Sequence, residues 1–138
     1  MKTGFTCGAF DLLHAGHILM LEEAKSFCDY LIVGLHSDPT LDRAEKNKPI
    51  QSLQERLIQV RAVKFVDLVV IYDTESDLVG ILKALEPDLR IIGADYINKP
   101  FTGDDLGIET KFNSRNHSFS SSELRRRIQE AENRKETK

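Results

Sequence analysis

Apolar and polar residues alternate along this chain in blocks whose lengths suit strands and helices in turn. Short apolar runs bounded by polar or glycine-containing stretches predict five strands. These runs cover residues 3–10, 30–35, 66–72, 88–93 and 108–112. Between them, apolar residues recur at helical spacing and predict helices. The helices cover residues 16–27, 51–63 and 75–85, and a last one follows a serine-rich segment at 118–122.

This order of elements predicts an α/β fold. Strands that alternate with helices favour a doubly wound, parallel five-stranded sheet of the Rossmann-like type, with helices on both faces. Ligands of such sheets bind beyond the carboxyl ends of the strands, where the strand order reverses. The unusual polar residues follow the predicted strands, in segments 8–17, 36–48, 93–96 and 113–122. We therefore expect the functional site at this edge of the sheet.

The length and composition suit one globular domain. Of 138 residues, 41% are apolar and 30% are charged, which separates the chain from disordered proteins. We expect a single domain over residues 1–129 and a charged, frayed tail over 130–138. The amino-terminal "MKTGFTCGAF" is too short and polar for a signal peptide, and no apolar run approaches the ~20 residues of a membrane span. We therefore expect a cytoplasmic protein without a membrane partner.

The net charge of −3 argues against nucleic acid as a partner. The three arginines at 125–127 are interpreted as a solvated helix face rather than an RNA site. Cys7 and Cys28 lie 21 residues apart without a CxxC spacing, so we expect two buried thiols in a reducing compartment and no metal-ligating residues. An anionic ligand would have to be held by local cations and backbone N–H groups.

The segment "GAFDLLHAGH" places His14 and His17 directly after the first predicted strand. If a helix begins near Gly16, its first N–H groups favour an anion at this point. Two imidazoles can donate to phosphate oxygens there, and a glycine lets a phosphate approach closely. Zinc is the competing interpretation, but no third ligand stands at suitable spacing. The segment therefore predicts an anion site, most simply for phosphate.

Four segments resemble the cytidylyltransferase-like nucleotidyltransferases that carry an HxGH signature. "GAFDLLHAGH" is similar to that signature, and "CDYLIVGLHSD" and "QERLIQVRAVKFVDLVV" resemble the phosphocholine and phosphoethanolamine enzymes. "RNHSFSSSELRRRI" resembles the last motif and helix of glycerol-3-phosphate cytidylyltransferase, the closest likeness. The resemblance covers about residues 3 to 128 in the expected order. It implies transfer of a nucleotidyl group from a nucleoside triphosphate to a phosphorylated alcohol, with release of pyrophosphate.

The resemblance also implies roles for individual residues. The expected catalytic residues are His14, His17, Lys46 and Arg115. The expected nucleotide-binding residues are Gly8, Ala9, Phe10, Gly16, Gly93, Asp95, Ser120 and Ser121. The expected acceptor-binding residues are Asp11, Lys48 and Lys64. Lys46 is preferred to Lys48 as the phosphate-binding lysine, while solvated lysines and a plain turn aspartate are the alternatives. Mg²⁺ is the implied cofactor, and a homodimer with Asp67 near the interface is the implied assembly.

The nucleobase and the acceptor stay open at this point. Asp95 in "GADY" could accept from the exocyclic amine of either cytosine or adenine. The likeness of "YLIVGLHSD", "KFVD" and the serine-rich motif favours CTP, with glycerol 3-phosphate or a related polyol or sugar phosphate as acceptor. The alternatives are an ATP-dependent adenylyltransferase, of the heptose-phosphate or archaeal FAD synthase type, and a non-catalytic nucleotide-binding module.

Overall fold

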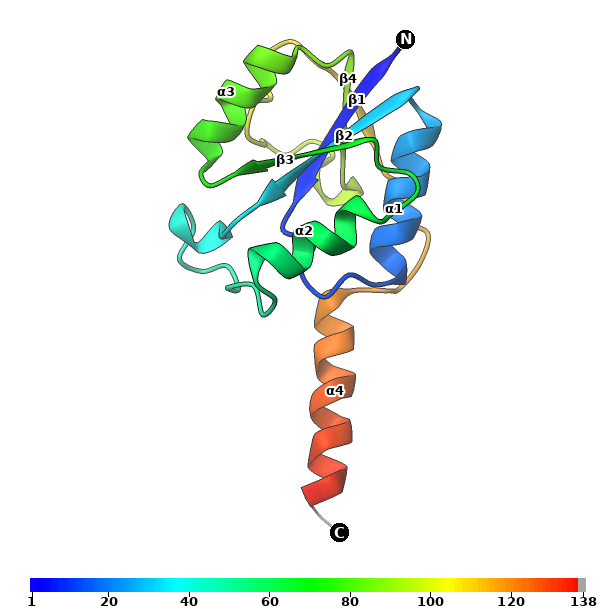
Figure 1. The fold of residues 1–138 in the computed structure, drawn as a ribbon, viewed down its shortest axis with the longest axis vertical. Coiled ribbons are helices and arrows are strands. Elements are labelled where there is room, and N and C mark those ends of the chain that lie inside the picture. Colours follow the sequence, from blue (N-terminus) through cyan, green and yellow to red (C-terminus); the bar gives the residue numbers. More distant parts are fainter. Residues whose placement is uncertain (137–138) are drawn as a thin grey trace.

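The computed structural model describes residues 1–136, and its centre is a parallel sheet of order β3-β2-β1-β4-β5 (Figure 1). The strands are β1 (Thr3–Gly8), β2 (Tyr30–His36), β3 (Leu68–Tyr72), β4 (Leu89–Ile92) and β5 (Glu109–Phe112). The helices are α1 (Ala15–Ser26), α2 (Leu53–Arg61), α3 (Glu75–Leu85) and α4 (Ser121–Glu136), with short 3₁₀ turns at Pro39–Leu41 and Ala94–Tyr96. The predicted fold class is confirmed. The strand order reverses between β1 and β4, so a ligand crevice is expected at their carboxyl ends.

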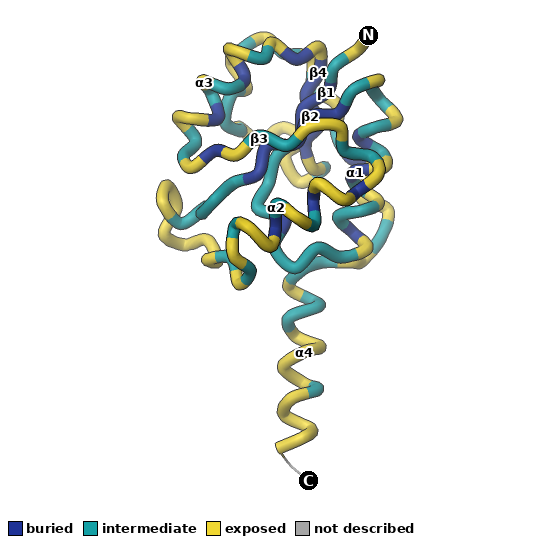
Figure 2. The backbone as a smooth tube through the Cα atoms, in the orientation of Figure 1, coloured by how far each residue is buried: buried dark blue, intermediate teal, exposed yellow. Residues whose placement is uncertain are grey.

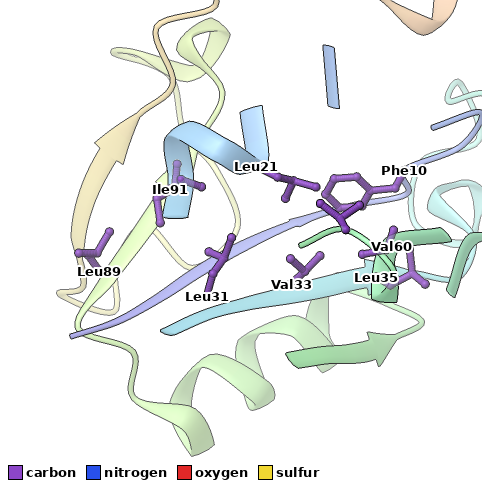
Figure 3. Packing of buried hydrophobic residues seen from close by; sticks show 10 residues of the cluster. Phe10, Leu21, Leu31, Val33, Leu35, Val60, Leu89 and Ile91 are labelled. Carbon is purple, nitrogen blue, oxygen red and sulfur yellow. The ribbon is translucent and has the colours of Figure 1, made fainter. Parts of the chain in front are cut away.

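Two apolar clusters hold helices against the two faces of the sheet. The cluster beneath α1 and α2 includes Phe10, Leu21, Leu31, Val33, Leu35, Val60, Leu89 and Ile91 (Figure 3). The cluster beneath α3 consists of Phe5, Ile32, Tyr72, Leu78 and Leu82. The buried runs of β1, β2 and β4 explain why those strands read as continuously apolar in the sequence. Cys7 and Cys28, expected to be buried, are half-buried free thiols at the margins of these clusters.

The first strand ends earlier than the sequence predicts. It stops at Gly8 rather than residue 10, because Phe10 and Leu12 adopt left-handed φ values of 50° and 52°. The ring of Phe10 turns back into the core, where it is 4% exposed. This bend carries Asp11 and the histidine pair over the carboxyl edge of the sheet.

Helix α4 projects away from the rest of the molecule (Figure 1) and contains no buried residue along its described length (Figure 2). It runs to Glu136, so residues 130–136, expected to fray, are helical instead. Ion pairs one turn apart, such as Arg126 with Glu130, support this continuation. Residues 137–138 of the predicted tail lie outside the described residues. Across residues 1–136, no helix has both the length and the apolar character that crossing a membrane requires.

Candidate active site

The two histidines form the amino-terminal cap of α1. His14 is the capping residue, and its Nδ1 accepts from the Gly16 N–H at 3.0 Å. The N–H of His14 in turn donates to Nδ1 of His17 at 3.2 Å. Because both Nδ1 atoms accept backbone hydrogen bonds, each neutral ring carries its proton on Nε2. The helix cap therefore turns two imidazoles into two fixed Nε2–H donors.

Both histidines are neutral at physiological pH. Burial, with a smaller contribution from the nearby His14, lowers the pKa of His17 to about 4, while Asp11 opposes the shift. Burial and the neighbouring His117 also lower the pKa of His14. The rings lie 4.0 Å apart between centroids, so two positive charges there would repel strongly. In the unliganded protein, the pair thus offers directed hydrogen-bond donors rather than positive charge.

Gly16 is required at this cap for steric reasons. A Cβ at this position would lie 2.8 Å from Cε1 of His14 and 3.0 Å from Cε1 of His117. Any larger residue would displace the His14 ring from its hydrogen bond. The glycine that the sequence marked for phosphate approach therefore also holds the ring geometry.

A second helix terminus meets the first. The Ser120 hydroxyl accepts from the Glu123 N–H at 3.1 Å and caps α4. The Oγ of Ser121 lies 3.2 Å from Nε2 of His14, whose proton it accepts. The Ser121 hydroxyl hydrogen is then directed away from His14 and can be donated to a ligand. The fold thus brings together two helix N-termini that are 107 residues apart in the chain.

A cavity of about 530 Å³ opens beside these two termini. Five of the predicted nucleotide-binding residues line it, namely Gly16, Gly93, Asp95, Ser120 and Ser121. Arg115, at a left-handed φ of 47°, pairs with Asp95 at 3.0 Å on its rim. His117 and Phe119 stack at 5.4 Å and provide an aromatic wall. We call this space the first cavity. At one end it offers hydrogen-bond donors suited to a phosphate. At the other end it offers aromatic and carboxylate groups suited to a nucleobase.

A second cavity, of about 620 Å³, continues from the first. The two share His17, Met20, Gly93, Asn113 and Arg115. Its wall includes the predicted Gly8, Ala9, Phe10 and Lys46, together with Arg43, Tyr72, Arg90, Tyr96 and Phe101. Gly8, Ala9 and Phe10, expected to bind the nucleotide, therefore lie in a different cavity from Asp95 and the serines. Two ligands seated in the two cavities would meet at His17.

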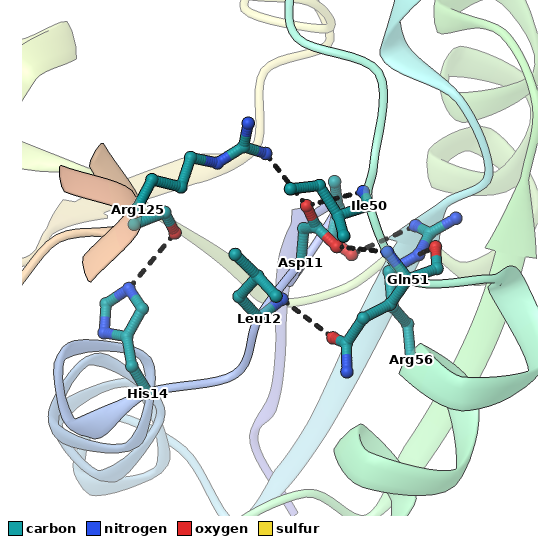
Figure 4. Close-up of polar contacts among 9 residues, drawn as sticks. Asp11, Leu12, His14, Ile50, Gln51, Arg56 and Arg125 are labelled. Carbon is teal, nitrogen blue, oxygen red and sulfur yellow. Dashed lines mark hydrogen bonds and ion pairs between the residues drawn. The ribbon is translucent and has the colours of Figure 1, made fainter. Parts of the chain in front are cut away.

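Asp11 does not lie in either cavity and belongs to a saturated polar cluster. Its carboxylate accepts from the N–H groups of Ile50 and Gln51, both at 2.9 Å, and from Arg125 at 3.1 Å (Figure 4). The Gln51 side chain accepts from the Leu12 N–H at 2.8 Å. The expected role of Asp11 in acceptor binding is therefore corrected: its oxygens hold the backbone at Ile50 and Gln51 and the side chain of Arg125.

Arg56 completes this cluster, which we call the clasp and define by Asp11, Gln51, Arg56 and Arg125. The Arg56 side chain is 2% exposed and donates to the carbonyls of Ala9, His36, Ser37 and Gln51 at 2.6–3.2 Å. These carbonyls lie at or just beyond the carboxyl ends of β1 and β2 and just before α2. The guanidinium gives each of these backbone oxygens a hydrogen-bond donor. The clasp fixes the loops that surround the histidine pair.

The structure also corrects two predicted lysines and one arginine. Lys48 is exposed and lines neither cavity. Lys64 precedes β3 at the amino edge of the sheet, with its ammonium 5.2 Å from the Phe65 ring. Since the strands are parallel, that edge is opposite the site. Arg125, expected to be solvated, is half-buried through its pair with Asp11.

Two buried polar residues of the cavities were missed by the sequence analysis. Asn113 is 5% exposed, lines both cavities and donates to Glu23 Oε1 at 2.8 Å, while its own Oδ1 has no partner in the described structure. Arg90 is 4% exposed and lies in the second cavity. A charged residue inside the apolar run "DLRIIG" was the available signal for Arg90.

The described side chains do not include a preformed metal site. No group of three His, Cys, Asp or Glu side chains within residues 1–136 is arranged to hold a metal ion. The carboxylate of Asp11, the candidate nearest the histidines, is occupied by two N–H groups and a guanidinium. The protein side chains of this site therefore do not form a metal cage of their own.

Comparison with known proteins agrees with this geometry. Residues 5–127 match the family model described as cytidylyltransferase-like. Relatives called bifunctional protein HldE include one from Caulobacter vibrioides, 41% identical over 107 residues, which are 77% of this chain and 22% of that protein. Another, from Helicobacter pylori, is 37% identical over 133 residues, which are 96% of this chain and 28% of that protein. The chain thus spans about a quarter of the curated relatives it matches.

Solved structures similar to this chain include two from other organisms. A protein of Thermoplasma volcanium described as a lipopolysaccharide core biosynthesis protein is 30% identical, with a TM-score of 0.66. The match covers 81% of this chain and 93% of that one. A pantothenate synthetase of Thermus thermophilus, 14% identical over 82% of this chain and 55% of its own, shares the fold with a TM-score of 0.59. On the match of the family model to residues 5–127, the chain belongs to the cytidylyltransferase-like family.

Proposed function

We propose that this chain is a nucleotidyltransferase that transfers AMP from ATP to a sugar phosphate and releases pyrophosphate. One observation carries the proposal: two cavities meet at His17, where both imidazole Nε2–H groups and two helix N-termini converge. Such a junction suits a reaction in which a nucleotide and an acceptor exchange a phosphoryl-linked group directly. A non-catalytic nucleotide-binding module would have no use for the second, cation-lined cavity.

The proposed reaction needs no protein nucleophile. An oxygen of the acceptor phosphate attacks the α-phosphorus of the nucleotide, and the bond from that phosphorus to the bridging oxygen breaks. Pyrophosphate leaves with the electron pair. Nε2–H of His17 donates to the charge that grows on the α-phosphate and bridging oxygen, and His14 acts there together with the Ser121 hydroxyl. Lys46 and Arg115 supply positive charge from the second cavity and from the junction.

ATP and a sugar phosphate are preferred to CTP and glycerol phosphate. The HldE relatives favour the heptose-phosphate adenylyltransferase alternative that "GADY" had left open. The Thermoplasma likeness is associated with the lipopolysaccharide core, which is built of sugars. Asp95 on the wall of the first cavity can accept from the exocyclic amine of adenine as well as that of cytosine. CTP therefore becomes the second candidate in this proposal.

Mg²⁺ and a homodimer remain parts of the proposal. Mg²⁺ is ordinarily held through substrate phosphates and water. Its chemistry would be to neutralise the triphosphate. Asp67, expected near the subunit interface, pairs with Lys25 and accepts from the Leu31 N–H at 2.8 Å at the amino edge of the sheet. A dimer through that edge would leave the active edge open.

The test is pyrophosphate release with Mg²⁺, crossing ATP, CTP, GTP and UTP against heptose, hexose and glycerol phosphates. We expect release with ATP and a sugar phosphate, and its loss in His14→Ala and His17→Ala. Lys64→Met is the matched control, because this cation lies outside both cavities. Release with CTP alone would restore the cytidylyltransferase interpretation. Tight nucleotide binding without release from any pair would contradict the enzyme proposal.

A further inference from the structure

Arg90 is a buried cation in the wall of the second cavity, and no step of the proposed reaction uses it. It lies on β4 two residues before Ile92, the last residue of that strand, and hence about 7 Å below the carboxyl edge of the sheet. Its side chain is 4% exposed and lies against the Phe101 ring, with 5.1 Å from Cζ to the ring centroid. The position is deeper than His17, which lies above the edge where the cavities meet.

The guanidinium of Arg90 is only partly satisfied. Nη1 donates to the Thr102 carbonyl, and Nη2 lies 3.8 Å from Sγ of Cys7, which is a weak acceptor. Nε has no partner, and no carboxylate of residues 1–136 forms an ion pair with this arginine. A buried, unneutralised cation with spare donors is costly to keep for stability alone. Arg56, equally buried, shows the contrast because it donates to four carbonyls.

The other residues of the second cavity favour an acceptor that is both charged and hydroxyl-rich. Lys46 and Arg115 are cations on its wall, and the one acidic residue there, Glu75, is paired with Arg43 at 2.7 Å. Tyr96, which is 42% exposed, provides aromatic surface of the kind on which a sugar ring can lie. The volume of about 620 Å³ is within the range of small-molecule sites. The wall therefore suits a phosphorylated sugar more closely than a bare three-carbon phosphate.

We propose that Arg90 determines acceptor specificity by hydrogen bonding to an oxygen at the end of the sugar phosphate remote from its reacting phosphate. This inference rests on the proposed function. The reacting phosphate has to lie near His17, so the remote end of a sugar reaches down towards Arg90. Glycerol 3-phosphate is too short to use this contact. Arg90 is thus a selector of acceptor length and polarity, and it takes no part in the bond change.

The kinetic test compares hexose and heptose 1-phosphates with glycerol 3-phosphate in the full chain, in Arg90→Met and in Arg90→Lys. In Arg90→Met we expect KM for the sugar phosphates to rise about tenfold or more, the usual effect of losing a charge-assisted hydrogen bond. KM for ATP and for glycerol 3-phosphate should change less than twofold, and Arg90→Lys should recover part of the loss. An equal rise for all acceptors would place Arg90 at the phosphate and overturn the inference, as would no rise at all.

A second measurement protects the inference against a variant that fails to fold. The Nε–Hε resonance of Arg90 in the wild-type chain, assigned by its absence in whichever Arg90 variant folds or by sequential assignment, should shift saturably with mannose 1-phosphate. It should shift less with the 6-deoxy sugar phosphate and not with inorganic phosphate. A saturable shift without any turnover would sustain the inference and refute the proposed function. Turnover of sugar phosphates without a shift of this resonance would support the proposed function and refute the inference.

Discussion

The clasp and the histidine pair meet in the segment that holds Asp11, His14 and His17, but they differ in how their hydrogen bonds are used. In the clasp, Asp11 and Arg56 spend their acceptors and donors on backbone groups and on Arg125. In the histidine pair, the backbone occupies only Nδ1 of each ring; Nε2–H of His14 donates to the Ser121 hydroxyl, and that of His17 faces the junction of the cavities. Polar residues that hold the loops therefore have all their hydrogen-bonding groups paired within the protein, whereas polar residues suited to bind a ligand keep a donor for it. Both kinds stood in one short motif, and only the geometry distinguishes them.

The largest effect should follow from removing the centre of the clasp. Arg56→Met leaves four backbone carbonyls without their donor, in a place that solvent reaches poorly. We expect the free energy of unfolding to fall by about 4 kcal/mol, since each buried unsatisfied group costs about 1–3 kcal/mol and solvent recovers part of this. Urea denaturation followed by circular dichroism measures it. If stability held while activity vanished, Arg56 would belong with the ligand-binding residues.

Removing a donor from the histidine pair should act on the reaction rather than on the fold. His17→Ala deletes an Nε2–H that is fixed by the His14 backbone. We expect kcat to fall about 100- to 1,000-fold, which corresponds to about 3–4 kcal/mol of barrier. The melting temperature at pH 7 should change little in comparison with Arg56→Met. Equal losses of stability in both variants would remove the distinction between the two regions.

The pH dependence of stability offers a finer comparison. The pKa of His17 is about 4 in the folded chain and about 6.5 when exposed, so the unfolded state binds the extra proton between these values. Stability should therefore be full above about pH 6.5 and decline as the pH falls towards 4, by about 2 kcal/mol. Denaturation at pH 7.5 and 4.5 in wild type and His17→Ala isolates this contribution. A decline of the same size in the variant would assign it to other groups. Bound nucleotide should raise the pKa of His17 and reduce the decline.

The fold and half of the site were accessible from the sequence because their signals are local. Apolar runs and helical spacing placed the strands and helices, and Ser52 with Glu55 forms a capping box at the start of α2. The histidine cap and Gly16 were found because a strand, a turn and a helix start lie within ten residues. Ser121 was placed by its motif, although its contact with His14 spans 107 residues.

The positions of the remaining site residues could not be predicted, because they depend on which edge of the sheet each segment reaches in the folded chain. Lys64 was expected to bind the acceptor, but it precedes a strand, whereas Lys46 follows one. Asp11 was expected to face the acceptor because no local pattern reveals that Ile50 and Gln51 fold back to meet it. Arg90 was read as part of an apolar strand, and its role depends on a cavity that only the assembled sheet creates.

The smallest expected effect follows from removing the ion pair between Arg125 of α4 and Asp11 of the clasp. Arg125 pairs with Asp11 at 3.1 Å and, with the contact of Ser121 to His14, joins the helix to the loop that carries the histidine pair. Arg125→Met should raise KM for the nucleotide about fivefold, or about 1 kcal/mol, because a half-buried ion pair contributes modestly. Arg127→Met is the matched control, since Arg127 is exposed on the same helix. A change in Arg125→Met alone would show that the clasp reaches the ligand through α4. Equal changes in both variants would mean that helix charge, and not this contact, governs nucleotide binding.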